Sequence, residues 1–155
     1  MEEMISKNTV LRLTKLYEFM KARPSSKIEM RKWGEKNPEG TCLTAGCVAG
    51  WAGVHKDFRK AGYTLKSEDT HIPFKRAKNY HVLIPHYKEF TGYIAFSKFF
   101  GITADETDYL CNPFSYRALD RKNNGSVKKS AVMKRLKRYL QKYKKLKKEQ
   151  LEEVS

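Results

Sequence analysis

Apolar residues recur at helical spacing near the start of the chain. They are Val10, Leu13, Leu16, Tyr17 and Met20. Positions three and four residues apart lie on one side of an α-helix, so the pattern predicts an amphipathic helix that ends before Pro24. The following residues, 25–40, are expected to form a connector from which Met30 and Trp33 dip into the core.

Three more helices are predicted between residues 45 and 110. A stretch rich in small residues indicates a helix over residues 45–60, stopped by Gly62. Recurring aromatic residues predict another over residues 87–100, and Gly101 can end it because glycine adopts the left-handed conformation cheaply. The tetrapeptide TADE at residues 103–106 then matches a capping box, which predicts a short helix reaching residue 110.

The hydrophobic pattern is least regular over residues 65–87, which include Pro73 and Pro85. Short runs of residues that favour strands predict extended segments around residues 72–74 and 81–84. We therefore expect a small β or irregular insertion in this part of the chain.

The last helix is predicted to span about 25 residues, or about 38 Å at 1.5 Å per residue. Its apolar stripe consists of Val132, Leu136, Tyr139, Leu140, Tyr143 and Leu146. The expected fold is therefore mainly α, a single compact domain of four to five helices with the small insertion. Residues 1–120 would form the helical core domain. Residues 121–155 would form a long C-terminal helix packed on the core or extending from it.

Charge adds a functional prediction to this picture. The chain carries a formal net charge of +15, and thirteen Lys or Arg with no Asp or Glu lie between residues 121 and 148. The rest of the chain sums to only +2. Thirteen uncompensated charges exceed the net charge of about 2 to 8 that solubility asks of a small domain, so the segment indicates a polyanion-binding surface.

Nucleic acid is the expected polyanion, and an acidic host protein is the alternative partner. A purely structural explanation of the same charges is a solvated helix face that binds no partner. The predicted phosphate-contacting residues are Arg121, Lys122, Lys128, Lys129, Lys134, Arg135, Lys137, Arg138, Lys142, Lys144 and Lys145. The rings of Tyr116, Tyr139 and Tyr143 would either stack on bases or pack in the core. Contacts of this kind hold phosphates and carry little sequence information.

A second candidate site is the stretch TCLTAGCVAGWAG at residues 41–53. Small residues recur in it at helical spacing, which favours a helix that another element approaches closely. The residues are Ala45, Gly46, Ala49, Gly50, Ala52 and Gly53. If Thr44 caps this helix, the backbone N–H groups of Ala45, Gly46 and Cys47 would form an anion cradle for a small molecule such as a nucleotide signal. Neither of the two common phosphate-loop patterns is present.

Cysteine chemistry is a further hypothesis for the same stretch. Cys47 would lie in the first helical turn, where the helix dipole favours a thiolate, and His81 or His86 could supply the base of a cysteine hydrolase. Buried, inert cysteines are the commoner outcome. The spacing of the cysteines and histidines predicts no metal site, and no motif indicates a cofactor.

The same residues resemble a group of small bacteriophage and bacterial proteins with the pattern M-x-x-W, then C-G-T-x-x-C-I-A-G-W-A, then G-I-T. The matching residues are Met30, Trp33, Cys42, Thr44, Cys47, Ala49, Gly50, Trp51, Ala52, Gly101, Ile102, Thr103, Glu106 and Leu110. The chain departs from the pattern at Leu43, Val48 and Cys111. The resemblance covers roughly residues 28–113. It implies a small α-rich fold and a phage or bacterial setting, and it implies no reaction.

These observations lead to one expected function and three alternatives. We expect a non-enzymatic, phage-type accessory protein that binds nucleic acid in the cytoplasm of a bacterial host. The acidic start of the chain and the lack of any apolar run of about 20 residues argue against a signal peptide and a membrane span. The alternatives are a small-molecule-sequestering protein, a protein-binding inhibitor of a host factor and a cysteine hydrolase. The sequence does not indicate the oligomeric state.

Overall fold

A computed structural model describes residues 7–28, 35–36, 43–45, 47–69, 81–123 and 126–154, and its architecture is mainly α with a small sheet, as predicted. The α-helices in these residues are α1 (Lys7–Lys21), α2 (Val48–Ala52), α3 (Lys56–Lys60), α4 (Gly92–Phe100), α5 (Ala104–Cys111) and α6 (Lys129–Val154). Short 3-10 helices are η1 (Ser25–Lys27), η2 (Pro113–Ser115) and η3 (Ala118–Asp120). The predicted contribution of Met30 and Trp33 to the core lies outside the described residues.

The predicted insertion forms an antiparallel sheet. Its strands are β3 (Thr64–Asp69), β4 (His81–Tyr87) and β5 (Phe90–Thr91), in the order β3-β4-β5, and Lys66 pairs with Ile84. The predicted strand at 81–84 is therefore confirmed and runs three residues further, whereas the strand predicted at 72–74 lies outside the described residues. A separate pair of short strands joins β1 (Glu35–Lys36) to β2 (Leu43–Ala45).

The prediction of one continuous helix over residues 45–60 is wrong. Thr44 and Ala45 belong to β2, Cys47 is the N-cap of α2, and a turn at Gly53 and Val54 separates α2 from α3. The physical reason lies in composition, because each interior glycine disfavours a helix by roughly 0.5 to 1 kcal/mol relative to alanine. Gly50 lies inside α2 and Gly53 is its C-cap, so the predicted helix carries this cost at both positions.

The helix predicted over residues 87–100 begins later than expected, at Gly92. Tyr87 instead ends β4 and pairs with Phe90 across a tight turn, in which Lys88 has a φ of 54°. At these positions the backbone hydrogen bonds of the β4–β5 pair therefore decide the structure, although the apolar residues recur at helical spacing. The end of the helix is as predicted, since Gly101 caps α4 in the left-handed conformation with a φ of 71°.

The capping box of α5 is confirmed atom by atom. The Thr103 hydroxyl accepts a hydrogen bond from the Glu106 N–H at 3.0 Å, and the Glu106 carboxylate accepts one from the Thr103 N–H at 3.0 Å. This exchange satisfies two N–H groups that would otherwise lack partners at the start of the helix.

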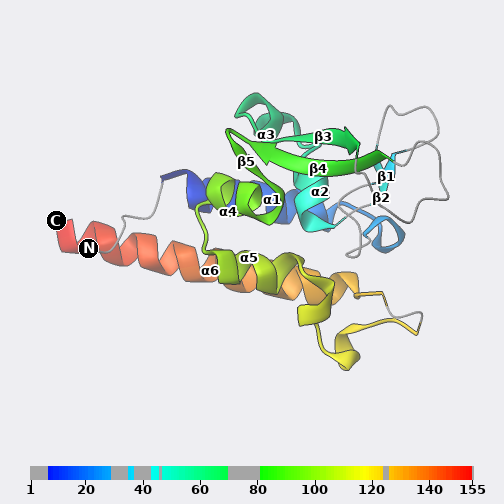
Figure 1. Ribbon diagram of the computed structural model, residues 1–155. Coiled ribbons are helices and arrows are strands. Elements are labelled where there is room, and N and C mark those ends of the chain that lie inside the picture. The colour runs from blue at the N-terminus through cyan, green and yellow to red at the C-terminus, as the bar shows by residue number, and fades with distance from the viewer. Residues whose placement is uncertain are drawn as a thin grey trace.

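Helix α6 lies between α1 and α5 and runs antiparallel to both (Figure 1). At its start, Lys129 reaches the end of α1, and further along Arg135 and Tyr143 meet Tyr109 and Glu106 of α5. On the other side of α1, the sheet β3-β4-β5 packs on α4. The C-terminal end of α6 extends past α1 and α4 in this view.

An aromatic cluster fills the core between α4 and the sheet. It contains Phe58, Tyr63, Phe96, Phe99 and Phe100, all nearly inaccessible, with neighbouring ring centroids 4.4 to 6.3 Å apart. The Tyr63 hydroxyl donates to the carbonyl of Ala49 at 2.7 Å. At Gly53 an added Cβ would lie 2.4 Å from the Leu65 side chain. The predicted close approach to this stretch is therefore present, and the element that approaches is strand β3.

Candidate polyanion interface

One face of α6 is part of the protein core. Val132, Leu136, Tyr139, Leu140 and Tyr143 are each no more than 7% exposed, as the apolar stripe predicted. Because these residues fix the rotation of the helix against α1 and α5, they also determine which side chains face solvent.

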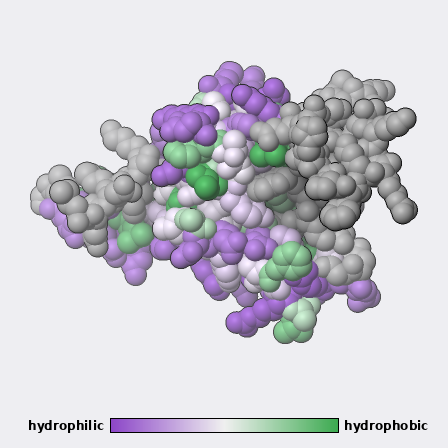
Figure 2. Space-filling view, in the orientation of Figure 1, coloured by the Kyte–Doolittle hydropathy of each residue, from purple (hydrophilic) through white to green (hydrophobic). Residues whose placement is uncertain are grey.

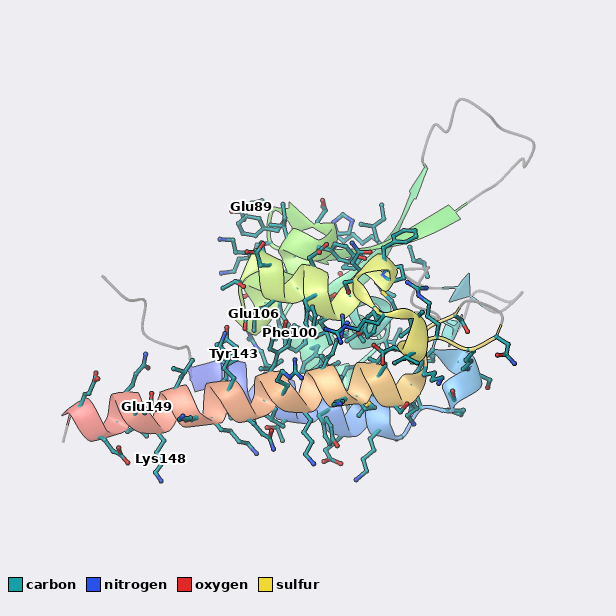
Figure 3. The ribbon with its side chains drawn as sticks, turned by 90° about the horizontal axis from the view of Figure 1, so that it is seen from below. Glu89, Phe100, Glu106, Tyr143, Lys148 and Glu149 are labelled. Carbon is teal, nitrogen blue, oxygen red and sulfur yellow. The ribbon has the colours of Figure 1, made fainter. Side chains whose placement is uncertain are left out.

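Six cations lie on the opposite face of α6 and form what we call the cationic stripe. They are Lys134, Lys137, Arg138, Lys144, Lys145 and Lys148, and all are exposed. Counted from Lys134, the other five follow at three, four, ten, eleven and fourteen residues, which places all six along one side of the helix. Gln141, seven residues after Lys134, lies at the centre of this side. Lys148 points away from the rest of the chain in Figure 3. Fourteen residues at 1.5 Å each give a stripe about 21 Å long.

Arg135 was predicted to contact phosphate, and the structure contradicts this prediction. Its side chain is buried, with 6% of the residue exposed, between the rings of Tyr109 and Tyr116. The guanidinium carbon is 3.7 Å and 3.6 Å from the two ring centroids. The same group donates hydrogen bonds to the Tyr109 carbonyl, the Ser115 hydroxyl and the Ser115 carbonyl. Arg135 therefore joins α5, η2 and α6.

Other predicted phosphate contacts are also tied into the fold. The Lys129 ammonium donates to the carbonyls of Lys21 and Arg23 at 2.7 and 2.5 Å, which satisfies the C-terminal end of α1. Arg121 donates to the Pro113 carbonyl, and Lys128 donates to the Leu119 carbonyl at 3.1 Å. These cations hold the segment before α6, so their charge adds to the surface potential while their side chains have structural roles. Lys122 is half-buried.

Lys142 belongs to a cluster with Glu106 and Tyr143 at the junction of α5 and α6. Figure 3 labels Glu106 and Tyr143. The Lys142 ammonium lies 2.9 Å from the Glu106 carboxylate, and the Tyr143 hydroxyl donates to that carboxylate at 2.5 Å. Burial by itself would raise the pKa of Glu106, but the hydrogen bonds from Tyr143, Lys142 and the Thr103 N–H outweigh it and leave this pKa below its ordinary value. Burial, together with the hydrogen bond to Glu106, raises the pKa of Tyr143.

We predict that Glu106→Gln lowers the free energy of unfolding by about 1 to 2 kcal/mol at pH 7, because the lysine and tyrosine donors lose a charged acceptor. A carboxyl with a depressed folded pKa stabilises above its unfolded pKa of about 4.3, and this stabilisation is lost as the pH falls through the folded value. Urea unfolding at pH 7 and pH 3 measures both effects. The variant should be less sensitive to acid than the wild type.

Asp105→Asn is the matched control, because Asp105 is exposed in the same helical turn. It should change stability by no more than about 0.5 kcal/mol. Equal acid sensitivity of the wild type and the Glu106 variant would contradict the assigned role of the cluster.

The residues predicted to form an anion cradle are not arranged as expected. Thr44 and Ala45 lie in β2, Gly46 lies outside the described residues, and Cys47 precedes α2 as its N-cap. The backbone N–H groups predicted to open a helix at Thr44 therefore belong in part to a strand, and α2 itself spans only five residues.

Cys47 is not an accessible nucleophile. It is 2% exposed, and burial raises the pKa of its thiol to about 11. Burial likewise raises the pKa of Cys111. His81 and His86, the predicted bases, are both residues of β4. Of the two cysteines in the part of the chain that the structure describes, neither has the solvent-exposed thiolate that hydrolysis requires.

The three tyrosines that were predicted either to stack on bases or to pack are packing residues. Tyr116, Tyr139 and Tyr143 are 4%, 7% and 6% exposed. The Tyr116 hydroxyl donates to the Leu110 carbonyl at 2.7 Å.

Sequence periodicity missed two exposed apolar side chains on the segment before α6. Phe114 in η2 is 87% exposed and Leu119 in η3 is 86% exposed. Figure 2 shows hydrophobic side chains over this segment, with hydrophilic ones beside them. For Phe114, the sequence feature that could have indicated this exposure is its position directly after the helix-breaking Pro113, outside every periodic apolar stripe.

The described residues include no helix long and apolar enough to cross a membrane. Within those same ranges, no group of three or more His, Cys, Asp and Glu side chains is placed to hold a metal ion.

Comparisons of the chain with protein-family models, with curated proteins and with solved structures found no match. The resemblance to the phage and bacterial group therefore remains a prediction from the sequence motifs.

Proposed function

We propose that this protein is a non-enzymatic nucleic-acid-binding protein whose contact surface is the cationic stripe. The supporting observation is that six exposed cations share one face of a helix whose other face is fixed in the core. No acidic residue interrupts the sequence from Lys134 to Lys148, and Glu149 and Glu152 end the stripe. The phage or bacterial setting rests on the motif resemblance alone.

The shape of the surface favours a linear polyanion. The stripe is narrow and about 21 Å long, with about three cations for every two helical turns of 5.4 Å. A nucleic-acid strand carries one phosphate every 3.4 Å along duplex DNA, so such a strand can follow several consecutive cations. Contacts to phosphates position a protein without reading bases, so the proposed binding is largely independent of sequence.

The salt dependence of binding tests this proposal. If all six cations contact phosphates, the logarithm of the association constant should fall with that of salt concentration with a slope of about −4 on single strands and about −5 on duplexes. Affinity then drops by roughly 300- to 2,000-fold between 50 and 200 mM salt. Fluorescence anisotropy with labelled oligonucleotides measures both slopes. Undetectable binding at 50 mM salt, or a slope near zero, would contradict the proposal.

An acidic host protein is the second candidate partner, because the same exposed cations would attract a cluster of carboxylates. Pull-down from host lysate separates the two functions when it is performed with and without nuclease. If a host protein is still captured after nuclease treatment, the result favours a protein-binding inhibitor. If nuclease abolishes the capture, the result favours bridging by nucleic acid.

A further inference from the structure

Phe114 is exposed on the η2 turn, and this turn is attached to α6 one residue after Lys134, the first cation of the cationic stripe. Arg135, the neighbour of Lys134, donates hydrogen bonds to both the hydroxyl and the carbonyl of Ser115, the residue after Phe114. The η2 turn is thereby attached to the flank of α6. Arg138 of the stripe reaches the same side, since its guanidinium lies 3.4 Å from the Tyr109 hydroxyl.

The backbone that carries Phe114 is held rigidly. The Phe114 N–H donates to the Asn112 side chain at 2.9 Å, the Ser115 hydroxyl donates to the carbonyls of Tyr109 and Asn112, and the Pro113 carbonyl accepts from Arg121. Exposing a phenylalanine forfeits the free energy that its burial would contribute. Phe114 nevertheless exposes its ring from a turn whose backbone is fixed by hydrogen bonds. Such a residue is preorganised for contact, because the protein loses little conformational entropy when a partner packs on the ring.

We propose that Phe114 is a stacking platform for a nucleobase and that the preferred ligand is single-stranded nucleic acid running along the cationic stripe. This inference rests on the proposed function and deepens it. A single strand offers both negative phosphates and exposed base faces, and aromatic side chains beside a basic groove bind such strands without regard to sequence. In a duplex the base faces are covered by neighbouring bases, so no base face is available for the ring to stack on.

The positive charge of the segment that carries Phe114 favours this occupant over an apolar peptide. Arg117, Lys122 and Lys128 belong to the segment that carries Phe114 or flank it, and Lys134 begins the stripe. An apolar partner without negative charge would leave these cations uncompensated, whereas a phosphodiester strand pairs with them while a base covers the ring.

Four probes of similar charge test the inference by fluorescence anisotropy: a 20-nucleotide oligothymidylate, a 10-base-pair duplex, a 20-unit strand of abasic sites and a 20-residue polyglutamate. We expect Phe114→Ala to weaken binding of oligothymidylate about tenfold and to leave binding of the abasic strand unchanged. Phe114→Trp should retain the affinity. Leu119→Ala, which removes an equally exposed side chain without a ring, is the matched control and should have little effect.

The outcomes separate the two proposals. Equal loss on oligothymidylate and on the abasic strand, or no loss at all for Phe114→Ala, overturns the stacking role while nucleic-acid binding stands. Affinity for polyglutamate equal to that for oligothymidylate, and unaffected by Phe114→Ala, overturns the inference in favour of an acidic protein partner. Absence of binding to all four probes removes both proposals. Because the ring is 87% exposed, the substitution should leave the thermal midpoint unchanged.

Discussion

Replacing all six cations of the cationic stripe with glutamine is expected to lower affinity for nucleic acid by at least about 100-fold at 50 mM salt. Each phosphate contact contributes through the release of a condensed counterion, so removing six contacts also flattens the salt dependence towards zero. The measurement is the anisotropy titration repeated at several salt concentrations. Because the six side chains are exposed, their loss should leave the fold intact, which circular dichroism can verify.

A matched variant controls for net charge. It replaces the six exposed cations Lys21, Lys27, Lys56, Arg59, Lys60 and Lys66, which lie on α1, η1, α3 and β3. Both variants carry the same reduced charge, so any difference between them reports the position of the cations. If the two variants lose affinity equally, binding depends on overall charge, and the stripe is not the contact surface.

Arg135→Ala is expected to lower the free energy of unfolding by about 3 kcal/mol. The substitution removes two cation–π contacts, takes the Arg135 donor from the half-buried Ser115 carbonyl and leaves the Tyr109 carbonyl with the Ser115 hydroxyl as donor. For a domain of this size a loss of 3 kcal/mol lowers the melting temperature by roughly 6 to 12 °C. Differential scanning calorimetry and urea unfolding provide the two measurements.

The neighbouring Lys134→Ala is the control for Arg135, because Lys134 is exposed and should change stability by less than about 0.5 kcal/mol. The opposite pattern is expected for nucleic-acid binding at a temperature where both variants are folded. There, Lys134→Ala reduces the salt slope by about 0.7 on single strands, and Arg135→Ala retains the wild-type slope. A stable Arg135 variant that binds weakly would restore Arg135 to the contact surface.

Local rules predicted much of this fold because several elements depend on residues close in sequence. The buried stripe of α6, the capping box at Thr103 and Glu106 and the left-handed Gly101 all follow from spacing or from the preference of one residue. The cationic stripe is the geometric complement of the apolar stripe on the same helix. The helix prediction therefore indicated most of the cations that face solvent, whereas exposed Lys148 was not among the predicted contacts.

The failures arose where distant residues decide the outcome. Arg135 looks like its basic neighbours in sequence, and only the positions of Tyr109 and Tyr116 make it a buried contact. Threonine is a common N-cap residue, but at Thr44 the pairing of β1 with β2 places the residue in a strand. Phe114 carries no periodic pattern, so its exposure depends on the hydrogen bonds that fix the η2 turn.

The antiparallel packing of α6 on α1 has a consequence for synthesis of the chain. Lys129 binds the carbonyl of Lys21 across a separation of 108 residues, so at about 5 to 20 residues per second α1 waits roughly 5 to 20 s for its partner. Until α6 is synthesised, the face of α1 that packs on α6 in the finished protein has no partner. The packing of α1 is therefore completed only after α6 has left the ribosome.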